Sequence, residues 1–208
     1  MARFVDVHPE DPQPRRLAQI VQALEEDALI AYPTDSGYAL GCRVGNREGR
    51  DRILRIRGLD DRHHFTLVCQ DFSQLGQLVQ VENHAFRAIR SATPGPYTFI
   101  LKATPEVPRR LLHPKKRTVG VRIPDHPFVT ALLDALGEPM LTSTLILPGE
   151  DEPRTVGWEV KEDLDHAVDL VVDAGEVSAA PTTVVDLSDG TAEVLRVGAG
   201  DPTPFLED

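Results

Sequence analysis

Short apolar runs rich in branched residues recur along the whole chain, and they constrain its fold more than any other feature. Each run is a few residues long and is bounded by turn residues, which is the pattern of a buried strand. Helical patterns are fewer and do not alternate strictly with these runs. The sequence therefore predicts an α/β (α+β) fold, a mixed sheet with helices packed on it, rather than a doubly wound parallel fold. We expect strands at residues 28–32 (ending at Pro33), 38–44, 65–69, 97–103, 118–123, 140–147, 167–173, 182–187 and 192–197.

Helix boundaries are marked by capping residues. Asn46 and Asp71 are suited to accept hydrogen bonds from the first turn of a helix. Pro127 fits a first helical turn, and Gly137 fits the position just after a helix. We expect helices over about residues 13–27, from Asn46 to about Arg57, after Asp71, and over residues 126–136, with an exposed polar connection at residues 148–163.

Length and composition fit one domain. The chain has 208 residues, 41% of them hydrophobic, which is enough for one sizeable core. We expect a single domain with its core at about residues 12–200 and a short C-terminal tail at residues 201–208. The first residues lack the pattern of a signal peptide, and no apolar run approaches the ~20 residues of a membrane span. Cys42 and Cys69 form no CxxC pair, so we expect no structural metal or disulfide and a cytoplasmic location.

The charge distribution is uneven. A net charge of −11 argues against a generic nucleic-acid binder, which is usually basic. Residues 109–122 nevertheless hold six basic residues and no acidic one, which favours a local anion site. A solvated charged loop is the alternative explanation. The candidates for RNA binding in this run are Arg109, Arg110, Lys115, Lys116 and Arg117.

The well-known phosphate, metal and nucleophile motifs are missing from the sequence. It contains no GxxxxGK[ST], GxGxxG, HExxH or GxSxG pattern. What remains is a set of hydroxyl and arginine side chains at strand ends. Each of them is more often structural when it stands alone, but together they can converge on a polyanion. The set comprises Thr34, Ser36, Thr98, Arg122, Ser143, Thr144, Arg154, Thr182, Thr183 and Arg196.

Five segments in order give the chain a family resemblance. They are "YPTDSGYALGC" (32–42), "PGPYTFIL" (94–101), "TVGVRIPDHP" (118–127), "PTTVVDL" (181–187) and "LRVG" (195–198). They resemble the PTET-x-YGLG, PGP-x-T, VGVR-x-P-x-HP, STVVD and R-x-G segments of the YrdC-like family, which includes threonylcarbamoyl-AMP synthases. The chain looks most like the YciO-type branch, over nearly its full length.

The resemblance implies a fold and a reaction. The fold is an open twisted mixed sheet with flanking helices and a basic concave face. The reaction joins L-threonine, bicarbonate and ATP to give threonylcarbamoyl-AMP and pyrophosphate, with Mg²⁺ on the ATP phosphates, and it supplies a transfer-RNA modification. No protein side chains alone would hold a metal. Some relatives bind double-stranded RNA or transfer RNA through the concave face. We expect positioning and charge neutralisation to carry the catalysis.

The resemblance also assigns roles to residues. Thr34 and Ser36 would bind threonine, and Tyr38 would form part of the pocket wall. Asp35 would bind an ammonium or order the loop; a tight turn in which Asp35 caps its own backbone is the alternative. The expected catalytic residues are Arg57, Thr144 and Arg196, and the expected substrate-binding residues are Thr34, Ser36, Tyr38, Thr98, Arg122, Ser143, Arg154, Thr182 and Thr183.

Two family segments are altered in this chain. In place of K-x-R-P, Arg57 takes the lysine position, Leu59 the arginine position and Asp60 the proline position. In place of S-x-N, Thr144 keeps the hydroxyl and Ile146 replaces the asparagine. Two losses of this kind could each cost on the order of 2 to 4 kcal/mol in the transition state. The inserted residues 61–65 could bring Arg62, His63 or His64 toward the site.

These departures leave two functions open. The first is a threonylcarbamoyl-AMP synthase, slower or with an altered substrate preference. The second is a catalytically altered paralogue that binds double-stranded RNA, transfer RNA or a nucleotide. A related reaction, such as hydrolysis of a carbamoyl-adenylate or adenylation of another small acid, is a third option.

Overall fold

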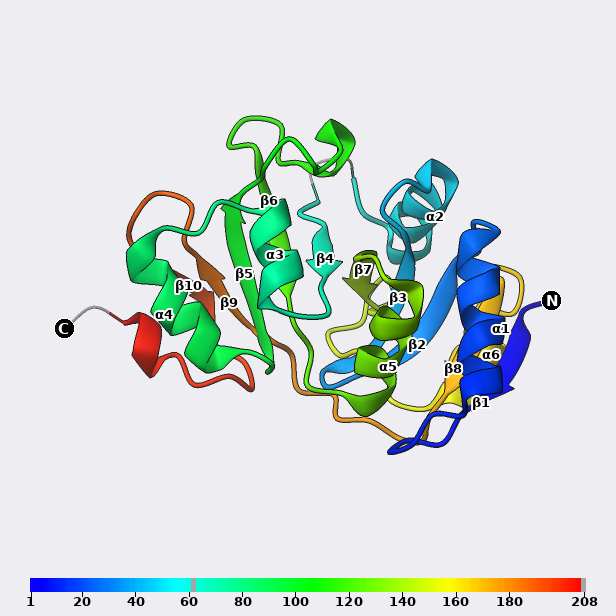
Figure 1. The fold of residues 1–208 in the computed structure, drawn as a ribbon. Helices are drawn as coiled ribbons and strands as arrows, with labels where there is room; N and C mark the ends of the chain where they lie inside the picture. The colour runs from blue at the N-terminus through cyan, green and yellow to red at the C-terminus, as the bar shows by residue number, and fades with distance from the viewer. Residues whose placement is uncertain (61–62, 207–208) are drawn as a thin grey trace.

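A single mixed sheet organises the molecule. The structure, a computed structural model, describes residues 1–60 and 63–206. Ten strands lie in the order β1-β8-β2-β3-β7-β4-β6-β5-β9-β10 (Figure 1). The strands are β1 Arg3–Asp6, β2 Ile30–Thr34, β3 Gly37–Arg43, β4 Thr66–Val68, β5 Tyr97–Lys102, β6 Thr118–Arg122, β7 Met140–Thr144, β8 Leu170–Asp173, β9 Thr183–Asp186 and β10 Glu193–Arg196. The helices are α1 Pro14–Glu25, α2 Arg47–Arg57, α3 Phe72–Leu78, α4 Asn83–Ala92, α5 Pro127–Leu136 and α6 Gly157–Leu164, with 3-10 turns η1 Arg109–Leu111 and η2 Thr203–Phe205.

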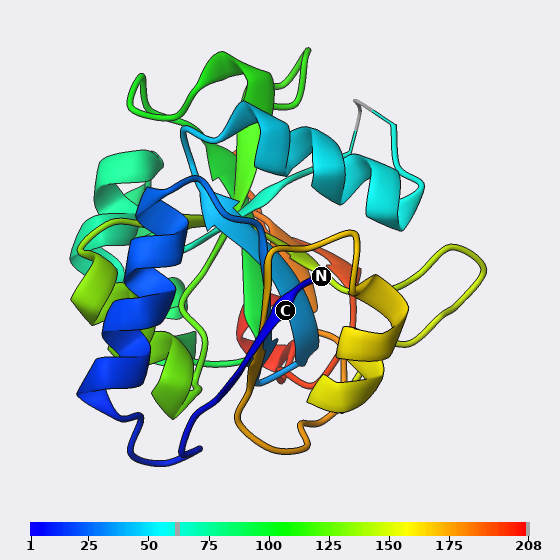
Figure 2. The ribbon, with the colours of Figure 1, turned by 90° about the vertical axis from the view of Figure 1, so that its right-hand side faces the viewer.

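Both strand directions occur in the sheet, which confirms the predicted mixed architecture. Strands β2–β3, β3–β7, β4–β7, β5–β6 and β9–β10 pair antiparallel, whereas β1–β8, β2–β8, β4–β6 and β5–β9 pair parallel. In Figure 2, α1 and α5 lie on one side of the sheet and α6 lies on the other. Because helices cover both faces, a central strand can be apolar at every position.

Strand β2 shows how two cores form on the two faces. Ile30 and Tyr32 belong to the cluster that includes the buried residues of α1 and α5. Ala31, together with Leu29 just before the strand, belongs to the larger cluster on the other face. Successive side chains of a strand point to opposite faces, so an unbroken apolar run fills both cores.

The predicted helix caps are confirmed. Asn46 accepts a hydrogen bond from the amide of Gly49 (2.7 Å), and Asp71 accepts one from Gln74 (2.8 Å). Pro127 lies in the first turn of α5. Gly137 follows the helix with φ 71°, a left-handed conformation that glycine adopts without strain.

Several sequence-based boundaries are corrected by the structure. Strand β2 runs from Ile30 through Pro33 to Thr34 and does not stop at Pro33. The sequence patterns gave no sign of β1 or α4. The predicted polar connection at 148–163 is wrong in its second half, because α6 begins at Gly157 and buries Val160 and Leu164. These two apolar residues are one helical turn apart, and charged neighbours hide the pattern.

One residue near the C-terminus packs against the core. Phe205 is 3% exposed. Its ring lies 5.8 Å from that of Tyr97 and 5.5 Å from that of Phe99. Asp201, Thr203, Pro204 and Leu206 around it are exposed, so this ring anchors an otherwise exposed segment. Among the helices that the structure describes, none is long and apolar enough to cross a membrane.

Gly41 offers a test of packing at the centre of the sheet. A Cβ atom at this position would lie 2.6 Å from Cε1 of the buried Tyr32 and 3.0 Å from Cε of Met140. We expect Gly41→Ala to lower the free energy of unfolding by about 1–3 kcal/mol, because overpacking forces its neighbours to shift. Urea denaturation measures this loss. Gly45→Ala is the control, since no heavy atom lies within 4 Å of its added Cβ; equal losses in the two variants would contradict the packing argument.

Candidate functional site

A central cavity of about 390 Å³ lies over the middle and one end of the sheet. One row of its floor crosses four neighbouring strands, because Thr142 pairs with Thr66, Thr66 with Gly120, and Gly120 with Ile100. A Cβ at Gly120 would lie 2.7 Å from Oγ1 of Thr66. Glycine at this position therefore leaves room for the Thr66 side chain, and no side chain of residue 120 fills the cavity. The lining consists of Arg57, His63, His64, Thr66, Thr98, Ile100, Gly120, Thr142, Ser143, Thr144, Ile146, Pro153, Pro181, Thr182, Val184, Leu195 and Arg196.

Arg57 enters the cavity from the last residue of α2. Its Nη1 donates to Oγ of Ser143 (2.8 Å), and its Nε donates to the carbonyl of Ile146 (3.4 Å). Burial lowers the pKa of its guanidinium. The lysine position of the family motif is therefore occupied here by a cation that contacts Ser143, just before the altered S-x-N segment, and Ile146 at its end.

The end of α2 turns Leu59 away from this cavity. Gly58 has φ 62°, and its amide donates to the carbonyl of Arg55 (3.3 Å) while the amide of Leu59 donates to that of Leu54 (2.9 Å). These two bonds form a Schellman motif, in which the residue after the glycine makes an apolar contact with the helix. Leu59 packs against the core cluster that contains Leu54. It lines a different groove, as does Asp60.

Arg196 enters the cavity from β10, at the edge of the sheet. Its Nε donates to the carbonyl of Thr182 and its Nη2 to Oγ1 of Thr182, each at 3.0 Å. The same Oγ1 lies 3.0 Å from Oγ1 of Thr98. Burial, followed by the positive charge of Arg122, lowers the pKa of Arg196.

Thr183 lies next to the cavity residue Thr182 but does not line the cavity itself. Its side chain is fully buried; Oγ1 donates to the carbonyl of Gly200 (2.6 Å) and accepts from the amide of Gly198 (2.9 Å). A Cβ at Gly198 would lie 2.2 Å from the carbonyl oxygen of Pro181. The turn after Arg196 is thus held against the start of β9 and the residues just before it, Pro181 and Thr182.

The loop at residues 34–37 is held by Arg122. Nη1 of Arg122 donates to Oγ of Ser36 (2.9 Å), and Nη2 forms an ion pair with Asp35, whose second oxygen accepts from the amide of Asp125 (2.9 Å). Oγ1 of Thr34 donates to the carbonyl of Gly37 (2.7 Å). Asp35 therefore orders the loop through Arg122 and Asp125 rather than by capping its own backbone. Nε of Arg122 is buried and has no hydrogen-bond partner among the described residues.

Tyr38 and Arg154 are among the predicted site residues that lie outside the cavity lining. Tyr38 is fully buried; its hydroxyl donates to Oδ1 of Asp173 (3.5 Å), and burial raises its pKa. Arg154 donates to Asp163 (2.7 Å) and to both carboxylate oxygens of Glu150. Its neighbour Pro153 lines the cavity instead. The structure thus brings Arg57, Thr98, Ser143, Thr144, Thr182 and Arg196 together, and keeps Thr34, Ser36, Tyr38, Arg122, Arg154 and Thr183 out of the lining.

The basic run at residues 109–117 is dispersed. Arg110 donates to the carbonyls of Val44 and Gly45, and Lys116 lies 3.6 Å from the carboxylates of both Asp186 and Asp189. Arg109, Lys115 and Arg117 are exposed. None of these five residues lines the central cavity.

His63 and His64 do line the cavity. Burial, then the charge of Arg57, lowers the pKa of His63 to about 4, so the imidazole is neutral at pH 7. Burial and His113 lower the pKa of His64. Arg62 lies outside the described residues. In the sequence, only the position of the insertion indicated that these histidines could reach the site. Nothing in the sequence indicated that Thr66, Gly120 and Thr142 line the cavity, because their pattern is that of ordinary strand residues.

The described residues offer no cluster of three or more His, Cys, Asp or Glu side chains that could hold a metal ion. Among residues 1–60 and 63–206, the cavity lining contains no carboxylate. Mg²⁺ prefers oxygen ligands and is usually held by carboxylates and substrate phosphates. The described side chains of the lining therefore lack the carboxylate ligands of a magnesium site.

The chain is similar in sequence and in fold to proteins of one family. Residues 22–198 match the Sua5/YciO/YrdC family model, described as "Telomere recombination". Uncharacterized protein YciO of Escherichia coli K12 is 49% identical over 206 residues, covering 99% of this chain and all of that protein. Its crystal structure superposes with a TM-score of 0.96 over 99% of this chain and 100% of that one.

More distant relatives have names that refer to threonine. Threonylcarbamoyl-AMP synthase of Vibrio vulnificus YJ016 is 29% identical over 187 residues, 88% of this chain and 98% of that protein. The crystal structure of P. abyssi Sua5 complexed with L-threonine has a TM-score of 0.85 and 25% identity, and covers 94% of this chain and 57% of that one.

The Arg122–Asp35 ion pair generates a stability prediction. The side chains are only 6% and 12% exposed. We expect Asp35→Asn to lower the free energy of unfolding by about 3–5 kcal/mol, because it leaves a buried guanidinium without its counter-charge. Urea denaturation measures the loss. Glu138→Gln, which breaks the half-exposed pair with Arg43, should cost no more than about 1 kcal/mol. Similar losses in the two variants would contradict the argument that burial makes the Arg122–Asp35 pair more important for stability than an exposed pair.

His63 generates a pH prediction. Its folded pKa of about 4 lies below the ordinary histidine value of 6.5, so the unfolded chain takes up the proton first as pH falls. This contribution to stability is present above pH 6.5 and is lost as pH falls toward 4. We expect His63→Gln to reduce the difference in unfolding free energy between pH 7 and pH 5. His166→Gln, at a side chain that is 82% exposed, should leave that difference as it is in the parent protein. A difference unchanged in His63→Gln would contradict the assignment.

Proposed function

The chain belongs to the Sua5/YciO/YrdC family, and on that premise we propose that it is a threonylcarbamoyl-AMP synthase-like nucleotidyl transferase. One observation carries the proposal. The central cavity gathers Arg57, Arg196 and hydroxyl side chains of three strands and a loop, and none of its described lining residues is a carboxylate. This environment suits a polyphosphate, because guanidinium forks and hydroxyls donate hydrogen bonds to its oxygens.

The proposed reaction consumes L-threonine, bicarbonate and ATP. The threonine amine and bicarbonate give a carbamate and water. A carbamate oxygen then attacks the α-phosphorus of ATP, the bond to the β-phosphate oxygen breaks, and pyrophosphate leaves. Negative charge spreads over the phosphate oxygens during this displacement. Positioned cations and donors therefore supply the catalysis, and no covalent nucleophile is needed.

The cavity residues divide into two groups in this proposal. Arg196, with Thr182 and Thr98 beside it, neutralises phosphate oxygens at the β5–β9–β10 side. Arg57, with Ser143 and Thr144, does so on the opposite side. Mg²⁺, when it is bound to ATP, supplies further charge neutralisation. No step of the proposal depends on a protein-held metal.

We assign threonine to the region near the 34–37 loop. Arg122 has one buried donor, Nε, without a partner among the described residues, and Ser36 and Thr34 lie beside it. A carboxylate is the natural acceptor for such a donor. The L-threonine complex of P. abyssi Sua5 supports an amino-acid substrate. Tyr38, Arg154 and Thr183 would act by holding the walls rather than by touching the substrate.

We also place this activity in the cytoplasm and link it to transfer-RNA modification, the use to which threonylcarbamoyl-AMP is put. Both cysteines are free and buried, as expected for a protein that functions without disulfides.

A second candidate function rests on Ile146. Its side chain lines the cavity at the position of the family's asparagine, and its carbonyl accepts a hydrogen bond from Arg57. The donor that an amide would offer is therefore missing, and Arg57 is partly engaged. This observation favours a paralogue that binds a nucleotide, or an RNA, without completing the transfer.

The proposal is tested by incubating the protein with ATP labelled at the α-phosphate, threonine, bicarbonate and Mg²⁺. We expect labelled threonylcarbamoyl-AMP, and a loss of about 10²–10³-fold in rate for Arg196→Ala, because the variant removes a donor to the developing charge. Arg87→Ala, at an exposed arginine of α4, should keep the rate of the parent protein.

The outcomes separate the two candidates. ATP binding without product formation supports the second candidate and overturns the first. Failure to bind ATP overturns the first candidate and the nucleotide-binding form of the second. Product formation that Arg196→Ala does not reduce would show that the chemistry occurs elsewhere than in this cavity.

A further inference from the structure

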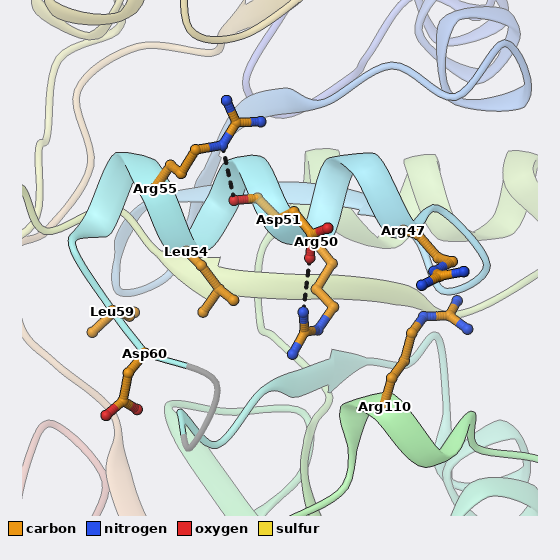
Figure 3. Close-up of a pocket in the computed structure, with 8 residues that line it drawn as sticks. All are labelled: Arg47, Arg50, Asp51, Leu54, Arg55, Leu59, Asp60 and Arg110. Carbon is orange, nitrogen blue, oxygen red and sulfur yellow. Dashed lines mark hydrogen bonds and ion pairs between the residues drawn. The ribbon is translucent and has the colours of Figure 1, made fainter.

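A second groove lies on the other side of the segment that follows α2. It has a volume of about 720 Å³ and lies between α2 and η1 (Figure 3). Leu59 and Asp60 line this groove, whereas His63 and His64, a few residues later, line the central cavity. The two sites are therefore adjacent but use different side chains. The groove is lined by Arg47, Arg50, Asp51, Leu54, Arg55, Leu59, Asp60 and Arg110.

Four arginines and two aspartates make the groove positively charged in a protein whose net charge is −11. In Figure 3 the guanidinium groups of Arg47 and Arg110 approach each other from the first turn of α2 and from η1. Nη1 of Arg50 pairs with Asp51 (2.7 Å). Arg55 extends along the opposite side of the helix in this view. The two facing groups, Arg47 and Arg110, therefore form the positive end of the groove.

Arg110 is held in place by the backbone. Its Nη2 donates to the carbonyls of Val44 (3.1 Å) and Gly45 (2.9 Å), which lie just before α2. This anchoring uses one nitrogen of the guanidinium and fixes the direction of the others. A fork that is already ordered loses less conformational entropy when it binds an anion.

Arg47 has no carboxylate partner among the ion pairs of the described residues, and its side chain is exposed. Two like charges that face each other are unfavourable until a counter-charge comes between them. Two guanidinium forks together suit a tetrahedral anion with several oxygens, because each fork can donate to a different pair of oxygens.

We propose that Arg47 and Arg110 form a phosphate-binding site that is separate from the central cavity. The phosphate could come from an RNA backbone or from a free polyphosphate, since the chemistry of recognition is the same for both. The groove lies at the surface beside the cavity, so it can take one phosphate of a longer ligand. The proposal goes beyond the synthase-like activity and does not depend on it.

The test measures two probes with the full-length protein. One is inorganic triphosphate, followed by titration calorimetry, and the other is a fluorescently labelled RNA duplex, followed by anisotropy at several salt concentrations. All measurements use the Arg196→Ala background, which weakens phosphate binding in the cavity. We expect Arg47→Ala and Arg110→Ala each to weaken at least one probe by about tenfold or more. For RNA, each should also reduce the salt slope by about one unit.

Arg109→Ala is the matched control, because Arg109 precedes Arg110 in the same turn, is exposed and does not line the groove. Arg110→Lys is a second control for folding: it keeps a positive charge and should retain part of the affinity. Loss of RNA binding alone identifies a backbone phosphate, and loss of triphosphate binding alone identifies a free phosphate; both support the site. Equal losses in Arg109→Ala, or no binding of either probe by the parent background, would overturn the proposal.

Discussion

The buried ion pair between Arg122 and Asp35 is the interaction on which the central site depends. Arg122 ends β6, whereas Asp35 lies in the turn between β2 and β3, which is separated from β6 by two strands of the sheet. The pair therefore fastens a turn at one side of the cavity to a strand that runs beneath its centre. Its polar neighbours, Ser36 and the amide of Asp125, complete the hydrogen bonding that a buried pair needs to be stable.

The cavity itself arises from small side chains at positions where a sheet normally carries large ones. Threonine or glycine stands at three of the four floor positions from Thr142 to Ile100. The opposite arrangement is found in β2, where Ile30, Ala31 and Tyr32 all fill a core. The protein thus gives up burial over one part of the sheet, and Arg57 and Arg196, which line the space, donate to hydroxyls and carbonyls. Stability given up in this way is typical of a binding site.

The sequence predicted the parts of the fold that local chemistry determines. Asn46 and Asp71 predicted helix starts and Gly137 predicted a helix end, because capping depends only on residues close in the sequence. The strand patterns predicted a mixed sheet, but β1 and α6 were missed, because short elements with one to three buried residues leave little periodic signal. For the site, strand-end hydroxyls and arginines were identified as a set, yet the sequence could not separate Thr182, which faces the cavity, from Thr183, which faces the core. That difference depends on register, which only pairing across the sheet defines.

The turn after α2 has a consequence for how related chains are compared. Gly58 reverses the path of the backbone, so that Arg57 and Leu59 face separate compartments although they are two positions apart. Two related chains can therefore have different residues at the same aligned position, while the side chains of those residues lie in different sites of the folded protein. A Leu59→Arg substitution would place the guanidinium in the groove, and the central cavity would gain no arginine. To move that side chain, the backbone turn has to change first, and such a change takes several residues rather than one.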